Sequence, residues 1–162
     1  MIIRKTTIND ISVLEKLFES AREYMISKGN SNQWTNGYPD IDTIKSDIEK
    51  SQSYVCVDDD GIILATFVFY IGIEEDYKNI EDGAWINDNE YGVIHRLASN
   101  RSKKGIASFC LNWCYNKINN IRVDTHKDNI PMQKLLEKEG YTQCGIITLK
   151  RSGDKRIAFQ KV

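Results

Sequence analysis

The spacing of apolar residues along the chain predicts alternating strands and helices. Residues 2–6 read as a short strand, and apolar side chains then recur every three or four positions, as on one face of a helix. Asn9 is predicted to cap the start of this helix, with Ile8 and Val13 paired as a hydrophobic staple. Gly29 is predicted to end it, because glycine readily adopts the left-handed conformation that closes a helix.

The rest of the chain continues the alternation between turn residues. A polar loop over 30–39 leads to a short helix from about residue 40 to 50, and residues 72–90 are irregular and polar. Further strands are predicted over 54–57, 62–70, 91–98, 121–125, 141–149 and 156–162, and further helices over 103–118 and 129–139. The strand–helix–strand unit over 91–125 should be a right-handed crossover between parallel strands. The predicted fold is α/β, a single domain over 1–162 with a mixed sheet, a central parallel strand pair and flanking helices.

Charge and composition narrow the classes of function. The chain has 22 Lys and Arg against 23 Asp and Glu, so it lacks the positive surplus with which proteins bind nucleic acid or an anionic membrane. No apolar run approaches the roughly 20 residues of a membrane span, and the N-terminus turns polar too early for a signal peptide. The four cysteines form no Cys-x-x-Cys pair, which favours a reduced, cytoplasmic protein.

Candidate chemistry gathers where the two parallel strands end. Ligands bind outside the carboxyl ends of strands in open α/β sheets, and both histidines, His95 and His126, fall at these ends. Strand alternation predicts that His95 shares a face with Leu97 and that Arg96 lies on the other face. An arginine inside a central strand needs a partner, and Asp124 on the neighbouring strand is the expected one. A catalytic and a buried structural role are both open for the histidines.

A basic turn follows the first of these strands. Arg101, Lys103 and Lys104 precede Gly105 at the predicted start of a helix. A helix N-terminus offers free N–H groups and a partial positive charge, which suit a phosphate, and glycine lets a ligand approach the backbone. A solvated basic loop is the alternative. The chain has neither the Gly-x-Gly-x-x-Gly nor the Gly-x-x-x-x-Gly-Lys-Ser/Thr motif, which excludes those two nucleotide cradles.

Three segments stand in a characteristic order: residues 3–6 before the first helix, residues 93–107 around the basic turn, and residues 129–141. Over essentially its full length the chain thereby resembles the GNAT superfamily of acetyl-CoA-dependent N-acetyltransferases. The third segment is similar to the family's Asn-x-x-Ala-x-x-Leu-Tyr-Glu-Lys-x-Gly-Phe stretch, but Met132 replaces the alanine and Leu136 the tyrosine. That tyrosine often protonates the leaving thiolate in the family, so the usual general acid is absent or replaced.

The resemblance implies transfer of an acetyl group from acetyl-CoA to a primary amine, by direct attack in a ternary complex. His95 is the expected base and His126 the second candidate, since an imidazole accepts a proton near neutral pH. The aromatic residues Trp34, Tyr38 and Trp85 are candidates for acceptor contacts, the alternative being a lid over the core. No metal site is expected. The residues expected to hold acetyl-CoA are Leu97, Ala98, Ser99, Arg101, Lys103, Lys104, Gly105, Ile106, Ala107 and Asn129.

The sequence leaves open which acceptor the protein uses and whether it is a catalyst at all. The acceptor is a small-molecule amine, a protein N-terminus or a lysine side chain, with no nucleic-acid or membrane partner, and a homodimer is left open. The alternative function, motivated by Leu136, is a non-catalytic acyl-CoA-binding or sensor module.

Overall fold

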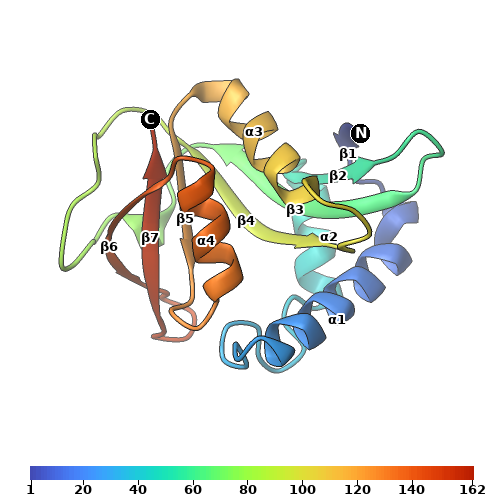
Figure 1. Ribbon diagram of the computed structural model, residues 1–162, viewed down its shortest axis with the longest axis horizontal. Helices are drawn as coiled ribbons and strands as arrows, with labels where there is room; N and C mark the ends of the chain where they lie inside the picture. Colours follow the sequence, from blue (N-terminus) through green and yellow to red (C-terminus); the bar gives the residue numbers. More distant parts are fainter.

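The computed structural model describes all residues, 1–162, and arranges seven strands and four α-helices around one mixed sheet (Figure 1). Two short 3₁₀ turns, η1 (Ile8–Asp10) and η2 (Glu75–Tyr77), complete the elements. The strands are β1 (Ile2–Lys5), β2 (Ser53–Val57), β3 (Ile63–Ile71), β4 (Gly92–Ser99), β5 (Ile121–Thr125), β6 (Thr142–Thr148) and β7 (Lys155–Lys161). The helices are α1 (Ile11–Ser27), α2 (Ile41–Glu49), α3 (Ile106–Ile118) and α4 (Ile130–Lys138).

The sheet has the strand order β1-β2-β3-β4-β5-β7-β6, and only the β4–β5 pair is parallel, which confirms the predicted fold class. These two strands pair only near their start, at Gly92 with Ile121 and at Val93 with Arg122. β4 then runs on to Ser99 without pairing with β5, and Figure 1 shows the two strands diverging. The fold therefore opens at the carboxyl ends of β4 and β5, where ligands of such sheets bind.

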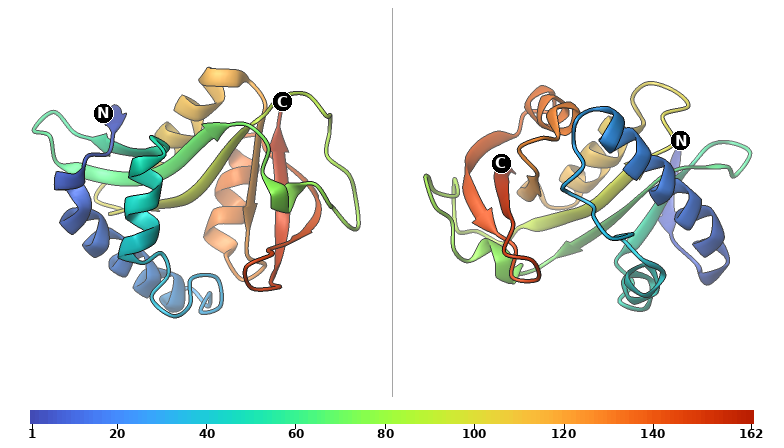
Figure 2. Two further views of the ribbon diagram at one scale, coloured as in Figure 1. Left: turned by 180° about the vertical axis from the view of Figure 1, so that it is seen from behind. Right: turned by 90° about the horizontal axis from the view of Figure 1, so that it is seen from below.

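Helices cover both faces of the sheet (Figure 2). α3 and α4 bury their apolar sides in the largest core cluster, against residues such as Phe67 and Phe159 of the sheet. α1 and α2 cover the opposite face, where Leu14 and Ile44 pack with Val55. The strands between are thus buried on both sides, which is why β3 reads as a nearly continuous apolar run.

β4 contains a bulge at Arg96, whose φ is +52° and where the register with β3 shifts. One extra residue reverses the alternation beyond it. Ile94 and Leu97 both pack on the α3 side, whereas Ala98 packs with α1 and α2. The predicted placement of His95 and Leu97 on one face is therefore wrong, because the bulge at Arg96 breaks the alternation of side chains along β4.

The start of α1 also differs from the prediction. The backbone N–H of Thr7 donates to Asp10 at 2.8 Å, and the turn η1 precedes the helix, so Asn9 is not its cap. Ile8 is 70% exposed and Val13 is 44% exposed, so no hydrophobic staple forms. The end of the helix follows the prediction, with Gly29 at φ +84°.

Candidate active site

Two cavities adjoin at the opening between β4 and β5. The larger, about 510 Å³, is lined mostly by polar side chains from both sides of the opening, and we call it the polar cavity. The smaller, about 210 Å³, is mostly apolar and lies between α1, the end of β4 and α4; we call it the groove. Met25, Leu97, Asn129 and Met132 line both, so a ligand in the groove reaches the polar cavity between these residues.

The groove is lined by six of the residues predicted to hold acetyl-CoA, namely Leu97, Ala98, Ser99, Arg101, Ala107 and Asn129. The Arg101 guanidinium lies over the Tyr24 ring, 4.3 Å from its centroid, and donates to Ser20 Oγ at 3.1 Å. These contacts fix its position between the turn and α1. The side chain of Ile106 is instead buried in the core, and Lys103 and Lys104 are exposed beside the groove.

Gly105 forms the N-terminal cap of α3 with a φ of +86°. A Cβ atom at this position would meet nothing within 4 Å, so the backbone faces open space. Glycine suits the left-handed conformation, and its missing side chain leaves the helix N-terminus accessible. The turn therefore fits an anionic group such as a phosphate.

His95 lines the polar cavity in a chain of hydrogen bonds. Its Nε2 lies 2.9 Å from Glu74 Oε2, and the same oxygen accepts from the Tyr70 hydroxyl at 2.5 Å. The hydrogen bond from His95 is the largest cause that lowers the pKa of Glu74 to about 2, and Tyr70 adds to it. Because the Glu74 carboxylate is ionised, Nε2 is the donor in this pair and Nδ1 is left as the nitrogen that can accept a proton.

Arg96 binds Asp47 of α2, which corrects the predicted pair with Asp124. Its Nε donates to Asp47 Oδ2 at 2.8 Å, its Nη2 to Oδ1 at 2.6 Å, and its Nη1 to the Tyr38 hydroxyl at 2.9 Å. The bulge turns the side chain toward α2, away from β5. Asp124 instead accepts from the fully buried Tyr77 hydroxyl at 2.6 Å.

The hairpin of β6 and β7 adds two arginines to the polar cavity. Arg156 is buried, and its Nη2 donates to the Gln33 carbonyl at 3.2 Å. Burial lowers the pKa of Arg156, whereas the pKa of Arg96 is raised, because its interactions with Tyr38 and Asp47 together outweigh the effect of burial. The Arg151 guanidinium lies 3.9 Å from the centroid of the Tyr38 ring.

The remaining predicted residues divide between the cavity and the scaffold. Trp34 and Tyr38 line the polar cavity. Trp85 lines neither cavity: its Nε1 donates to the Tyr77 carbonyl at 2.8 Å. His126 also lies outside, where its Nδ1 accepts from the Asp128 backbone N–H at 3.0 Å and burial lowers its pKa.

Comparison with known proteins assigns the family. No family model and no curated protein matches the sequence, but many solved structures match the fold. An acetyltransferase of the GNAT family from Streptococcus agalactiae is 32% identical, with a TM-score of 0.89 over 99% of this chain and 94% of the other. The chain belongs to the GNAT family.

Two further structures share the fold of this GNAT protein. A putative acetyltransferase from Staphylococcus aureus is 25% identical, with a TM-score of 0.71 over 99% of this chain and 98% of the other. A NatC complex bound to Gag peptide and CoA matches the fold at 15% identity, with a TM-score of 0.60 over 99% of this chain and 96% of that one. The 32% identical acetyltransferase supports acyl transfer as the general class of reaction.

Leu136 stands where the resemblance leads us to expect a tyrosine, and the structure shows where the leucine side chain lies. Leu136 is fully buried in the core cluster beneath α4. The adjacent Leu135 lines the groove. Leu136 therefore offers no hydroxyl to the α4 side of the groove.

No helix of the protein is both long enough and apolar enough to cross a membrane.

Sequence reasoning missed several residues of the polar cavity, Glu74 and Arg156 above all. Glu74 lies in the aperiodic segment 72–90, where no pattern predicts which way a side chain points. Arg156 reads as an ordinary charge at the start of an edge hairpin, although it is 2% exposed. The one available signal is the charge of these residues in segments that flank the strand ends.

Proposed function

We propose that this GNAT protein transfers the acetyl group of acetyl-CoA to a primary amine, with His95 as the base, and that residues 1–162 act as one domain. The observation that carries the proposal is the junction of an apolar groove and a polar cavity at the opening between β4 and β5. Such a pair of adjoining sites suits two substrates that must meet. Acetyl-CoA supplies a thioester carbonyl as the electrophile and a thiolate as the leaving group.

The groove residues fit acetyl-CoA. The open backbone at Gly105 and the side chain of Arg101 suit the pyrophosphate. Apolar residues such as Pro131 and Leu135 suit the pantetheine arm. Beyond Val93, β4 has no parallel strand partner, so its backbone groups on that side are available to bind the arm and to support the developing oxyanion.

The polar cavity fits the proton transfer. An alkylammonium of pKa about 10.4 must lose a proton before it attacks, which costs about 4–5 kcal/mol at pH 7. His95 Nδ1 accepts that proton, and Glu74 holds the ring and stabilises the imidazolium. The proposal gives His126 no role as a base, because it lies outside the cavity and its Nδ1 already accepts a hydrogen bond from the backbone.

The test is amine-dependent turnover. Acetyl-CoA is incubated with the protein and a panel of primary amines, and both free thiol and acetylated amine are measured. The proposal expects many equivalents of each per protein, in equal amounts. A sensor module, the alternative that Leu136 suggests, binds acetyl-CoA without amine-dependent thiol release, and that result would overturn the proposal.

A further inference from the structure

The polar cavity contains a buried arginine, Arg156, that donates no hydrogen bond to a carboxylate. The Arg156 side chain is 2% exposed, and its Nη1 and Nη2 donate only to the backbone carbonyls of Lys155 and Gln33, each at 3.2 Å. The carboxylate of Asp154 is 3.8 Å away and half-exposed. Its hydrogen-bond partners are neutral carbonyls, and the nearby carboxylates of Asp124 and Asp154 offset its burial only in part. A ligand anion in the cavity would complete the compensation of this buried charge.

Arg96 shows the contrast within the same cavity. Two of its nitrogens bind Asp47 at 2.6 and 2.8 Å, and a third binds the Tyr38 hydroxyl. Asp47 thus already neutralises the Arg96 guanidinium through a bidentate ion pair. An anionic ligand is therefore expected at Arg156 and not at Arg96.

A second free guanidinium lies on the same hairpin. Arg151 is exposed, stacks on the Tyr38 ring at 3.9 Å, and donates no hydrogen bond to any protein group. Stacking holds the flat face of a guanidinium and leaves its edge N–H groups free to bind an anion. Two arginines thus offer donors at the hairpin side of the cavity.

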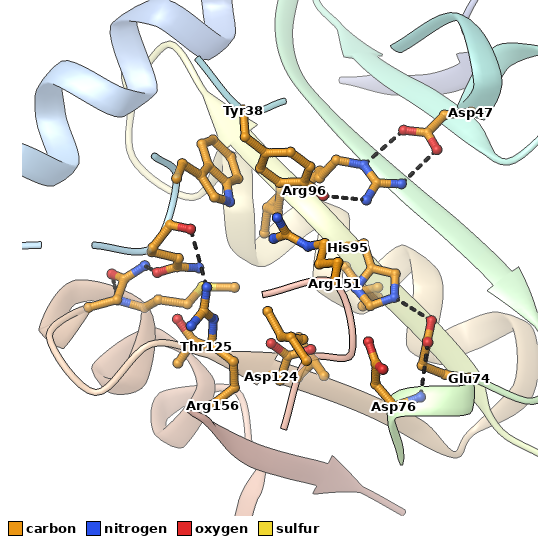
Figure 3. A pocket seen from close by; sticks show the side chains of 18 of the residues that line it. Tyr38, Asp47, Glu74, Asp76, His95, Arg96, Asp124, Thr125, Arg151 and Arg156 are labelled. Carbon is orange, nitrogen blue, oxygen red and sulfur yellow. Dashed lines mark hydrogen bonds and ion pairs between the residues drawn. The ribbon is translucent and has the colours of Figure 1, made fainter. Parts of the chain in front are cut away.

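The opposite side of the cavity is acidic. In Figure 3, Arg156 lies toward one side, Glu74, Asp76 and His95 lie toward the other, and Asp124 lies between them. The ionised Glu74 carboxylate attracts an ammonium group to the neighbourhood of His95. The cavity therefore has a positive end and a negative end within about 510 Å³, a volume suited to a small molecule.

We propose that the acceptor is a small zwitterion, a primary amine that also carries a carboxylate or phosphate. Its anionic group binds Arg156 and Arg151, and its amine lies beside His95 and Glu74. This inference rests on the proposed acetyl transfer and adds the substrate class.

The test compares acceptors that differ only in the anionic group. β-Alanine is paired with its amide, and phosphoethanolamine with ethanolamine; the two pairs distinguish carboxylate from phosphate. The wild-type kcat/KM is expected to favour the anionic member of at least one pair by about ten-fold or more, the effect of one hydrogen bond to a charged group. Calorimetry of the preferred zwitterion with the protein measures binding without turnover.

Variants of the two arginines locate the effect. Arg156→Gln and Arg151→Gln are expected to reduce the anionic-to-neutral ratio by about ten-fold, and Arg156→Lys to retain part of it. Lys155→Gln is the matched control, because Lys155 pairs with Glu81 outside the cavity. The ratio is informative even if a variant loses stability, since structural damage lowers both members of a pair equally.

Three results would overturn the inference. The wild-type ratios could be near one, the ratio could be insensitive to both arginine variants, or a peptide with an amidated C-terminus could be a better acceptor than every zwitterion. In each of these cases acetyl transfer itself stands. Absence of transfer to any amine, together with no zwitterion binding, refutes both the substrate class and the proposed function.

Discussion

The Glu74 carboxylate provides a prediction whose size follows from the structure. Folding lowers its pKa from 4.5 to about 2, with the hydrogen bond from His95 as the main cause. One pKa unit corresponds to about 1.4 kcal/mol, so the ionised carboxylate contributes about 3 kcal/mol to folding. The folded pKa lies below the unfolded one, so this contribution is complete above about pH 5.5 and is lost as the pH falls toward 2.

Glu74→Gln removes the charge with little change in shape. Urea unfolding of the variant and the wild type at several pH values is expected to show a difference of about 3 kcal/mol near pH 7, narrowing to about 1.5 kcal/mol near pH 3. Glu75→Gln is the control, because the side chain of Glu75 is 60% exposed and its pair with Lys78 contributes little. A difference that does not change with pH, or one no larger than the control's, would refute the role of the ionised pair with His95.

Three further predictions concern the groove, the cavity wall and the chemistry. Gly105→Glu is expected to abolish acetyl-CoA binding in calorimetry. Gly61→Glu, at an equally open left-handed glycine in the β2–β3 turn, is the control and is expected to bind normally. Equal affinities of the two variants for acetyl-CoA would show that the pyrophosphate does not bind at the start of α3. Asp47→Asn leaves Arg96 without its anionic partner and is expected to lower the free energy of unfolding by about 3 kcal/mol. The control Asp42→Asn, at an exposed position of the same helix, is expected to lower it by less than about 1 kcal/mol. Equal losses of stability in the two variants would contradict the role of the pair. Turnover is expected to be unchanged by EDTA, since the reaction as proposed uses no metal ion. A loss of turnover in EDTA that one added metal restores would show that the reaction depends on that metal.

The sequence predicts the scaffold of the site well. Period-3.6 and strand-like apolar runs locate the strands and helices, and the strand–helix–strand unit predicts the parallel pair β4–β5. The start of a helix at Asn129 follows from local pattern, whereas the place of Asn129 among the binding residues comes from the family resemblance. The strands and helices depend on neighbours in the sequence, which is why they are readable.

The parts that were missed depend on contacts across long stretches of chain. One extra residue in β4 turns Arg96 toward Asp47, and no pattern in residues 92–99 predicts this bulge. Arg156 reaches the carbonyl of Gln33, which is 123 residues away. Glu74 acquires its role only because an irregular segment folds back over His95. Periodicity cannot reveal pairings that the tertiary fold creates.

The most direct test of the account is the kcat/KM of His95→Ala for amine acetylation, measured with the acetyl-CoA dissociation constant and beside His126→Ala. A positioned base contributes about 10²–10⁴-fold, so His95→Ala is expected to lose activity by that factor, to keep its acetyl-CoA affinity and to lose the acidic limb of the pH–rate profile. His126→Ala is expected to retain most of the activity, because that ring lies outside the cavity. Full activity in His95→Ala, or a larger loss in His126→Ala, would contradict the account.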